Sequence, residues 1–84
     1  LRAYINNEEL GLTFIEFKIL CHALRNYPDL VTKEDMADHV WHKKHVLDAT
    51  IYTHISNLNG KIEAWDHEIS GLKSKGFHLV KKDA

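Results

Sequence analysis

Residues 50–62 read TIYTHISNLNGKI, and this stretch carries two patterns at the spacing of one helix. Four apolar residues recur at intervals that place them on one side of an α-helix, facing a core: Ile51, Ile55, Leu58 and Ile62. The other side has short hydrogen-bonding side chains in place of the usual lysines and glutamates: Thr53, His54, Ser56, Asn57 and Asn59. The stretch therefore predicts a helix over about 49–63, with one buried stripe and one polar face that docks elsewhere.

An earlier helix is predicted to begin at Thr13, because Thr13 and Glu16 have the spacing of a capping box. Pro28 ends it, since proline cannot continue a helix and biases the preceding residue away from helical geometry. The apolar residues at helical spacing predict a wide core stripe: Phe14, Phe17, Ile19, Leu20, Cys21 and Leu24. Cys21, the single cysteine, is interpreted as a small buried hydrophobe; it excludes an internal disulfide and suits a reducing compartment.

A second helix is predicted between a cap at Thr32 and Trp41, followed by a polar loop. Asp48 or Thr50 would cap the third helix. Residues 69–72 and 77–80 predict two short strands, joined by a loop in which Gly76 supplies a positive φ.

Two helices with a short connection, then a polar-faced helix and a basic hairpin, form the layout of a winged helix-turn-helix. We therefore predict one α+β domain over 1–84, with three helices and a C-terminal β-hairpin wing at 69–80. Residues 2–12, with Asn6-Asn7 between two short segments, predict a hairpin or the tail of a small sheet, as a short β remnant of a truncated N-terminal sheet. The abrupt start indicates a chain cut from something longer.

The composition of the 84 residues fits a small soluble domain with a net charge of −1. No apolar run approaches the ~20 residues of a membrane helix, and the start is not a signal peptide. The segment 69–82 holds four lysines and no acid, which favours a polyanionic partner on the C-terminal half. The alternative is a solvated lysine-rich end.

The polar face of the third helix has the chemistry of a DNA reader. Asn57 and Asn59 can each pair in a bidentate way with adenine. Hydroxyl, imidazole and ammonium groups can contact phosphates, and the hydroxyl residues can also touch a thymine methyl: Thr50, Thr53, His54, Ser56, Lys61 and, in the wing, Lys73 and Lys75. The alternative is a face that is simply solvated.

Five stretches occur together in the order of a known family. They are LTFIEFKIL at 12–20, ALRNYPDLVTKEDM at 23–36, VW at 40–41, THISNLNGKI at 53–62 and ISGLKSKGFHLV at 69–80. Together they resemble the C-terminal winged helix-turn-helix domain of OmpR/PhoB-type bacterial response regulators. The resemblance implies a cytoplasmic two-component transcription regulator that binds double-stranded DNA as a homodimer. It also implies an upstream receiver domain, and a loop with Lys43, Lys44 and His45 that contacts RNA polymerase.

The chain departs from that family in its charges, which makes it an atypical member. The family usually has arginine or lysine at five positions where this chain has none: Ala49, Ser56, Asn57, Asn59 and Gly60. Because phosphate neutralisation supplies most non-specific affinity, the loss leaves open a second hypothesis. On that hypothesis the domain is a protein-interaction module on a winged-helix scaffold, with weak or no DNA binding.

An enzyme and a cofactor are not expected. The sequence has no glycine-rich phosphate loop and no elbow serine, and a chain of this length leaves little room for a pocket. His39, His42 and His45 are spaced three apart, but His45 lies past the predicted helix end. Since a zinc site needs three or four convergent ligands, we expect no metal there.

Overall fold

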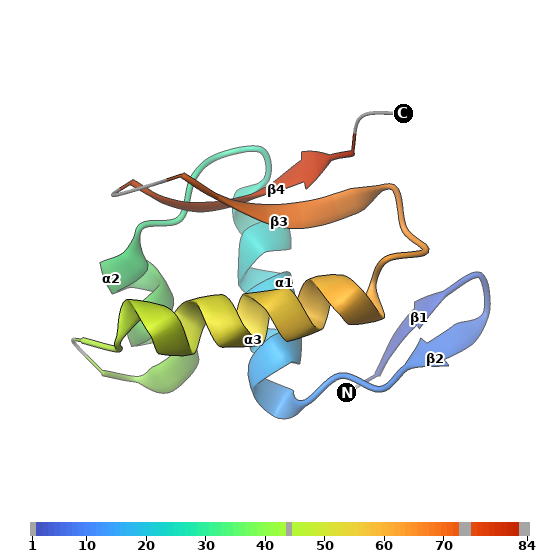
Figure 1. Ribbon diagram of the computed structural model, residues 1–84, viewed down its shortest axis with the longest axis horizontal. Coiled ribbons are helices and arrows are strands. Elements are labelled where there is room, and N and C mark those ends of the chain that lie inside the picture. The colour runs from blue at the N-terminus through green and yellow to red at the C-terminus, as the bar shows by residue number, and fades with distance from the viewer. Residues whose placement is uncertain (1, 44, 73–74, 83–84) are drawn as a thin grey trace.

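The structure is a computed structural model that describes residues 2–43, 45–72 and 75–82. Its elements are two hairpins and three helices, of which the second ends in a π-helical turn. In chain order they are β1 (Ala3–Ile5), β2 (Glu8–Leu10), α1 (Phe14–Asn26), α2 (Lys33–Met36), the π-helical turn η1 (Ala37–Trp41), α3 (Asp48–Lys61), β3 (His67–Leu72) and β4 (Gly76–Lys81). In Figure 1, α3 runs across the front of the molecule, with the β3–β4 hairpin along one side of it and α1 behind. Within the described ranges, no helix is both long and apolar enough to cross a membrane.

The predicted capping box at the start of α1 is confirmed. The Glu16 N–H donates to Thr13 Oγ1 over 3.1 Å, and the Thr13 N–H donates to Glu16 Oε1 over 2.9 Å. The predicted core stripe is partly wrong, because Phe14 is 64% exposed and Leu24 is 47% exposed. The buried line of α1 instead follows Glu16, Ile19, Leu20, His22 and Ala23. The helix can turn this way because Glu16 and His22 find polar partners, described below, so burial does not leave them unpaired.

The second helix begins after Thr32, whose hydroxyl accepts from the Asp35 N–H, as predicted. It ends at Trp41, and His42 has a left-handed φ of 56°. The prediction that Asp48 or Thr50 caps α3 is wrong: the N-cap is Leu47, and no described side chain caps the helix there. The Asp48 carboxylate instead accepts from Lys33 Nζ over 2.6 Å.

The wing is an antiparallel hairpin that is slightly longer than predicted. Its register runs from His67 opposite Lys81 to Leu72 opposite Gly76. Gly76 has a φ of 143°, which confirms the predicted positive φ. Val31 and Phe77 exchange two backbone hydrogen bonds of 2.7 and 2.8 Å, and these tie the wing to the segment before α2.

One core joins the helices to the wing. Three of the predicted apolar residues of α3 have exposures of 0–5%, and the fourth, Ile62, directly follows the helix and is 0% exposed. They belong to a single buried cluster that also contains residues of the other elements: Ile19, Leu20, Ala23, Val31, Met36, Val40, Ile51, Ile55, Leu58, Ile62, Ile69, Phe77 and Leu79. Burial along this stripe fixes how far α3 is rotated about its axis, and so decides which residues it shows to solvent. At the other end of the molecule, β1 pairs with β2 across Asn6-Asn7, as the predicted N-terminal hairpin.

Candidate nucleic-acid interface

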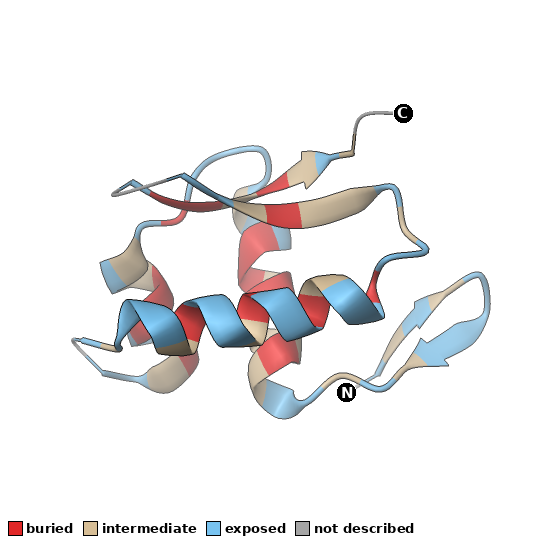
Figure 2. Ribbon diagram, in the orientation of Figure 1, coloured by how far each residue is buried: buried red, intermediate tan, exposed pale blue. Residues whose placement is uncertain are grey.

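The outer face of α3 is a continuous exposed stripe, visible as pale blue bands along the helix in Figure 2. Its residues lie three or four positions apart, which places them on one side of a helix. We call it the exposed face of α3 and define it by Ala49, Tyr52, Thr53, Ser56, Asn57 and Gly60, all of which are exposed. It lies opposite the buried line of Ile51, Ile55 and Leu58.

Ser56 and Asn57 lie in the middle of this face with exposed side chains. The Asn57 amide offers one acceptor and two donor hydrogens, which is the set that matches the N7 and N6 groups of adenine. Tyr52 is 41% exposed. The rings of Tyr52 and Phe77 pack edge to face with their centroids 5.4 Å apart, so Tyr52 connects the exposed face to the wing.

Asn59 lies outside this face, which corrects its predicted role as a base reader. Its Nδ2 donates to the Ile69 carbonyl oxygen, and its Oδ1 accepts from the Ile69 N–H, both over 2.9 Å. The amide is thereby engaged on both sides by the backbone of β3. A side chain held in this way is not available to pair with adenine.

Lys61 is also turned away from the predicted phosphate contact. Its Nζ donates to Glu16 Oε1 over 2.7 Å, and the Glu16 side chain is only 2% exposed. Burial acts to raise the pKa of Glu16, but hydrogen bonds from Lys61 and Thr13 outweigh it and lower the pKa below its ordinary value of 4.5. The Lys61 charge is therefore compensated within the fold.

The first turns of α3 contain three further residues predicted to contact DNA, and each is partly buried or already in contact with another residue of the domain. The Thr53 hydroxyl donates to the Ala49 carbonyl oxygen over 2.8 Å. Its hydrogen is therefore used within the helix, while its oxygen can still accept a hydrogen bond and its methyl group can contact a base. The His54 ring packs on Trp41, with centroids 5.6 Å apart. Thr50 is half-buried, and it lines a shallow hollow with Ala49, Thr53 and His54.

The structure describes only some of the basic residues outside α3 that were predicted to contact DNA or polymerase. Lys75 is exposed in the turn before Gly76 at the tip of the wing. Lys43 and His45 are exposed in the loop between η1 and α3. Lys73 and Lys44, predicted for the wing and for the polymerase loop, lie outside the described residues.

Two features of the site were not predicted from the sequence. The burial of Glu16, which holds Lys61, could be recognised only by noting that a capping-box glutamate also falls on the core line at 16, 19, 20 and 23. The second feature is the small size of Ala49 and Gly60 at the two ends of the exposed face. Both residues can be read from the sequence, but only the fold shows that they lie on this face. Such residues let a partner approach the helix backbone closely.

Known proteins similar to this chain place it among transcription regulators. Residues 7–79 match the family described as transcriptional regulatory protein, C terminal. The CpxR homolog of Haemophilus influenzae, a transcriptional regulatory protein, is 37% identical over 82 residues; the match covers 93% of this chain and 36% of that protein. The chain thus spans about a third of that relative's length.

Two solved structures share the fold. The AdeR DNA-binding domain, solved with an intercistronic region, has a TM-score of 0.80 and 23% identity, and the match covers 95% of this chain and 85% of that one. The RstA DNA-binding domain of Klebsiella pneumoniae, solved with the RstA box, has a TM-score of 0.81 and 14% identity, covering 94% and 82%. The fold is therefore the winged helix of response-regulator effector domains. With the family match extending over residues 7–79, the chain belongs to the C-terminal domain family of transcriptional regulatory proteins, the OmpR/PhoB type.

Proposed function

We propose that this domain binds double-stranded DNA in a sequence-specific way and thereby regulates transcription, with α3 entering the major groove. The observation that carries the proposal is the exposed face of α3, where Ser56 and Asn57 present hydrogen-bonding groups to solvent while the opposite stripe is locked in the core. A helix held rigidly along one side and polar along the other meets the requirement for reading base edges. Lys75 at the wing tip is placed to hold the DNA backbone.

Relatives and structural neighbours support the same proposal. Domains of this fold from AdeR and RstA were solved with DNA. By analogy with the regulators that this chain resembles, we propose a receiver domain upstream, pairing of two copies on two half-sites, and contact of RNA polymerase with the loop containing Lys43 and His45. By the same analogy we propose that the domain acts in the cytoplasm, and we propose no catalytic role for it.

The charge of the interface sets the expected affinity. None of the six residues that define the exposed face is an arginine or a lysine, and the nearby Lys61 is paired with Glu16. Each phosphate neutralised adds about 0.9 to the slope of log affinity against log salt. We therefore expect a shallow slope of roughly 2–4 per protomer, with pairing on DNA supplying the remaining affinity.

A salt series tests the proposal directly. Fluorescence anisotropy of the chain with a random duplex, and with duplexes enriched by selection, is measured between about 20 and 200 mM salt. Binding with the shallow slope and a preference for the selected duplexes supports the proposal. No binding even at ~20 mM salt overturns it in favour of a protein-interaction module. Lys75→Gln should lower the slope by about one and leave sequence preference unchanged.

A further inference from the structure

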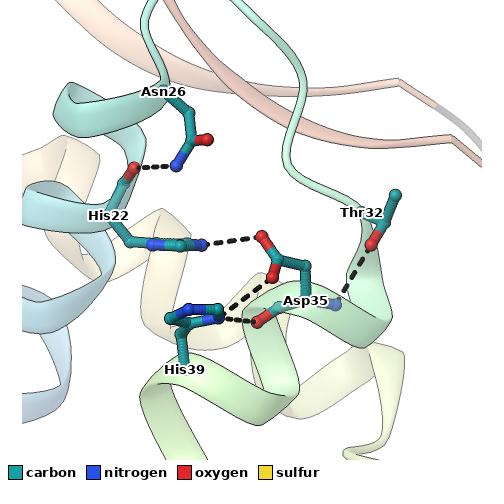
Figure 3. A network of polar contacts seen from close by, with 5 residues as sticks. All are labelled: His22, Asn26, Thr32, Asp35 and His39. Carbon is teal, nitrogen blue, oxygen red and sulfur yellow. Dashed lines mark hydrogen bonds and ion pairs between the residues drawn. The ribbon is translucent and has the colours of Figure 1, made fainter.

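Three side chains of the kinds that bind metal ions meet where α1 packs against the second helix. His22 comes from α1, Asp35 from α2 and His39 from η1. Each offers one ligand atom, and the three atoms all lie within 4.8 Å of one another. Figure 3 shows both imidazole rings turned toward the Asp35 carboxylate.

The two rings approach the same carboxylate through one nitrogen each. His22 Nε2 lies 2.8 Å from Asp35 Oδ2, and His39 Nδ1 lies 2.9 Å from Asp35 Oδ1. The rings are stacked, with their centroids 4.3 Å apart and their planes inclined by 20°. His39 Nδ1 also lies 3.1 Å from the Asp35 carbonyl oxygen. Two imidazole nitrogens and one carboxylate therefore lie close together, and a bound ion would replace the hydrogen bonds that now join them.

The cluster is held by the surrounding fold. His22 is 7% exposed, and its carbonyl oxygen accepts from Asn26 Nδ2 over 2.8 Å. The Asp35 N–H donates to Thr32 Oγ1 over 3.0 Å, which fixes the first turn of α2. His39 lies four residues after Asp35 and therefore on the same side of the helix, one turn along. These contacts hold the backbone at two of the three ligand residues and so fix where their side chains start.

The donor set suits a divalent transition metal more than calcium or magnesium. Imidazole ligands favour zinc, nickel and copper, whereas calcium and magnesium prefer oxygen. Zinc is held elsewhere by three protein ligands with a water molecule in the fourth position. Ligand atoms about 2.0–2.2 Å from a tetrahedral zinc ion lie roughly 3.3–3.6 Å apart, which the present separations reach by small side-chain shifts.

Solvent reaches the cluster through a neighbouring pocket. This pocket has a volume of about 280 Å³, and His22 and His39 both line it, so a water molecule can fill the fourth position. Lys18 and Arg25 line the same pocket, and their charges oppose a cation. The Lys18 Nζ is held by the Val40 carbonyl oxygen at 2.7 Å, and the Asp35 carboxylate supplies the compensating negative charge.

We infer that His22, Asp35 and His39 form a binding site for one divalent transition-metal ion, with Zn²⁺ the best match. The ion would link α1 to the second helix and brace the helical half of the domain. The site uses none of the residues proposed to contact DNA, so the metal site and the DNA-binding function can be tested separately. It differs from the trio His39, His42 and His45 considered from the sequence, because only His39 belongs to it.

Zinc titration of the 84-residue chain tests the inference. We expect isothermal titration calorimetry to show a site for one Zn²⁺ per chain, with no comparable binding of Mg²⁺. At a zinc concentration near 100 times the dissociation constant, the melting temperature should rise by at least about 5 °C. NMR should show the imidazole signals of His22 and His39 shifting together, while those of His78 stay in place. Absence of zinc binding up to about 1 mM overturns the inference.

Matched variants locate the ion. His39→Gln removes a half-exposed ligand, and Asp35→Asn keeps the size and the backbone N–H that bonds to Thr32. Each should weaken zinc binding at least tenfold while the circular dichroism spectrum stays that of the folded chain. His78→Gln, on β4, is the control and should bind zinc as the unmodified chain does. If His39→Gln binds zinc as tightly as the unmodified chain, the ion lies elsewhere and the inference is wrong.

Discussion

Asn59 and Ile69 are joined by two hydrogen bonds of 2.9 Å between the side-chain amide of one and the backbone of the other. They tie the last turns of α3 to the middle of β3, in addition to the core contacts that already join the helix to the wing. Asn57, two residues earlier, has the same amide but an exposed one. Folding therefore engages one amide and leaves the other open to solvent, although the two asparagines lie two residues apart in the same helix.

Asn59→Ala should lower the stability of the domain by about 1–3 kcal/mol, because it leaves the N–H and carbonyl of Ile69 without their partner. Urea unfolding followed by circular dichroism measures this loss. Asn57→Ala is the matched control and should stay within about 0.5 kcal/mol of the unmodified chain, as is usual for exposed sites. Equal stabilities for the two variants would contradict the structural role of Asn59.

Asn57→Ala should instead reduce sequence preference in DNA binding. Losing one bidentate contact with adenine costs about 1–3 kcal/mol of discrimination. The measurement is the ratio of affinities for a selected and a scrambled duplex at one salt concentration. The salt slope should stay unchanged, because no phosphate contact is lost. A ratio that does not fall would remove Asn57 from the reader role.

Glu16→Gln should make the domain less sensitive to acid. The lowered pKa of Glu16 means that the folded state favours the carboxylate form. The ion pair with Lys61 therefore stabilises the fold at pH values above 4.5, the ordinary pKa of this group. That stabilisation is lost as the pH falls through the lowered folded pKa. Urea unfolding of both proteins between pH 7 and pH 3 should show the unmodified chain more stable near neutral pH, with the difference shrinking below about pH 4.5. A difference that is constant with pH would argue against this role of the ion pair.

Gly76→Ala should destabilise the domain by at least about 1–3 kcal/mol, the usual cost of a strained backbone conformation. Gly76 has a φ of 143°, and an added Cβ atom would collide with the Val31 carbonyl oxygen, which accepts from the Phe77 N–H. Thermal melting should show a drop of several degrees.

Gly60→Ala provides the opposite control within the same protein. An added Cβ meets nothing within 4 Å there, and Gly60 lies inside α3. Alanine should therefore stabilise the helix by about 0.5–1 kcal/mol. If both alanine variants changed stability in the same direction, the assigned backbone roles of the two glycines would be wrong.

Local chemistry predicted much of the fold because its signals act within a few residues. The capping box at Thr13 and Glu16, the cap at Thr32 and the positive φ of Gly76 are all confirmed. The apolar line of α3 was predicted correctly as well, since a strict helical spacing leaves one way to bury it. The wrong cap of α3 has a tertiary cause, because Asp48 pairs with Lys33 fifteen residues away in sequence.

The sequence by itself determined the order of the elements, the buried stripe of α3 and the family, because periodicity, caps and motifs depend on neighbouring residues. Tertiary structure alone decided which polar groups remain open to a partner. Asn59 and Lys61 look like DNA contacts in the sequence. In the fold they bond instead to Ile69 and Glu16, which lie 10 and 45 positions away in the chain. Likewise, His22 joins Asp35 and His39 only because α1 packs against the second helix. A side chain's hydrogen bonds depend on what folding brings beside it, and a helical pattern does not contain that information.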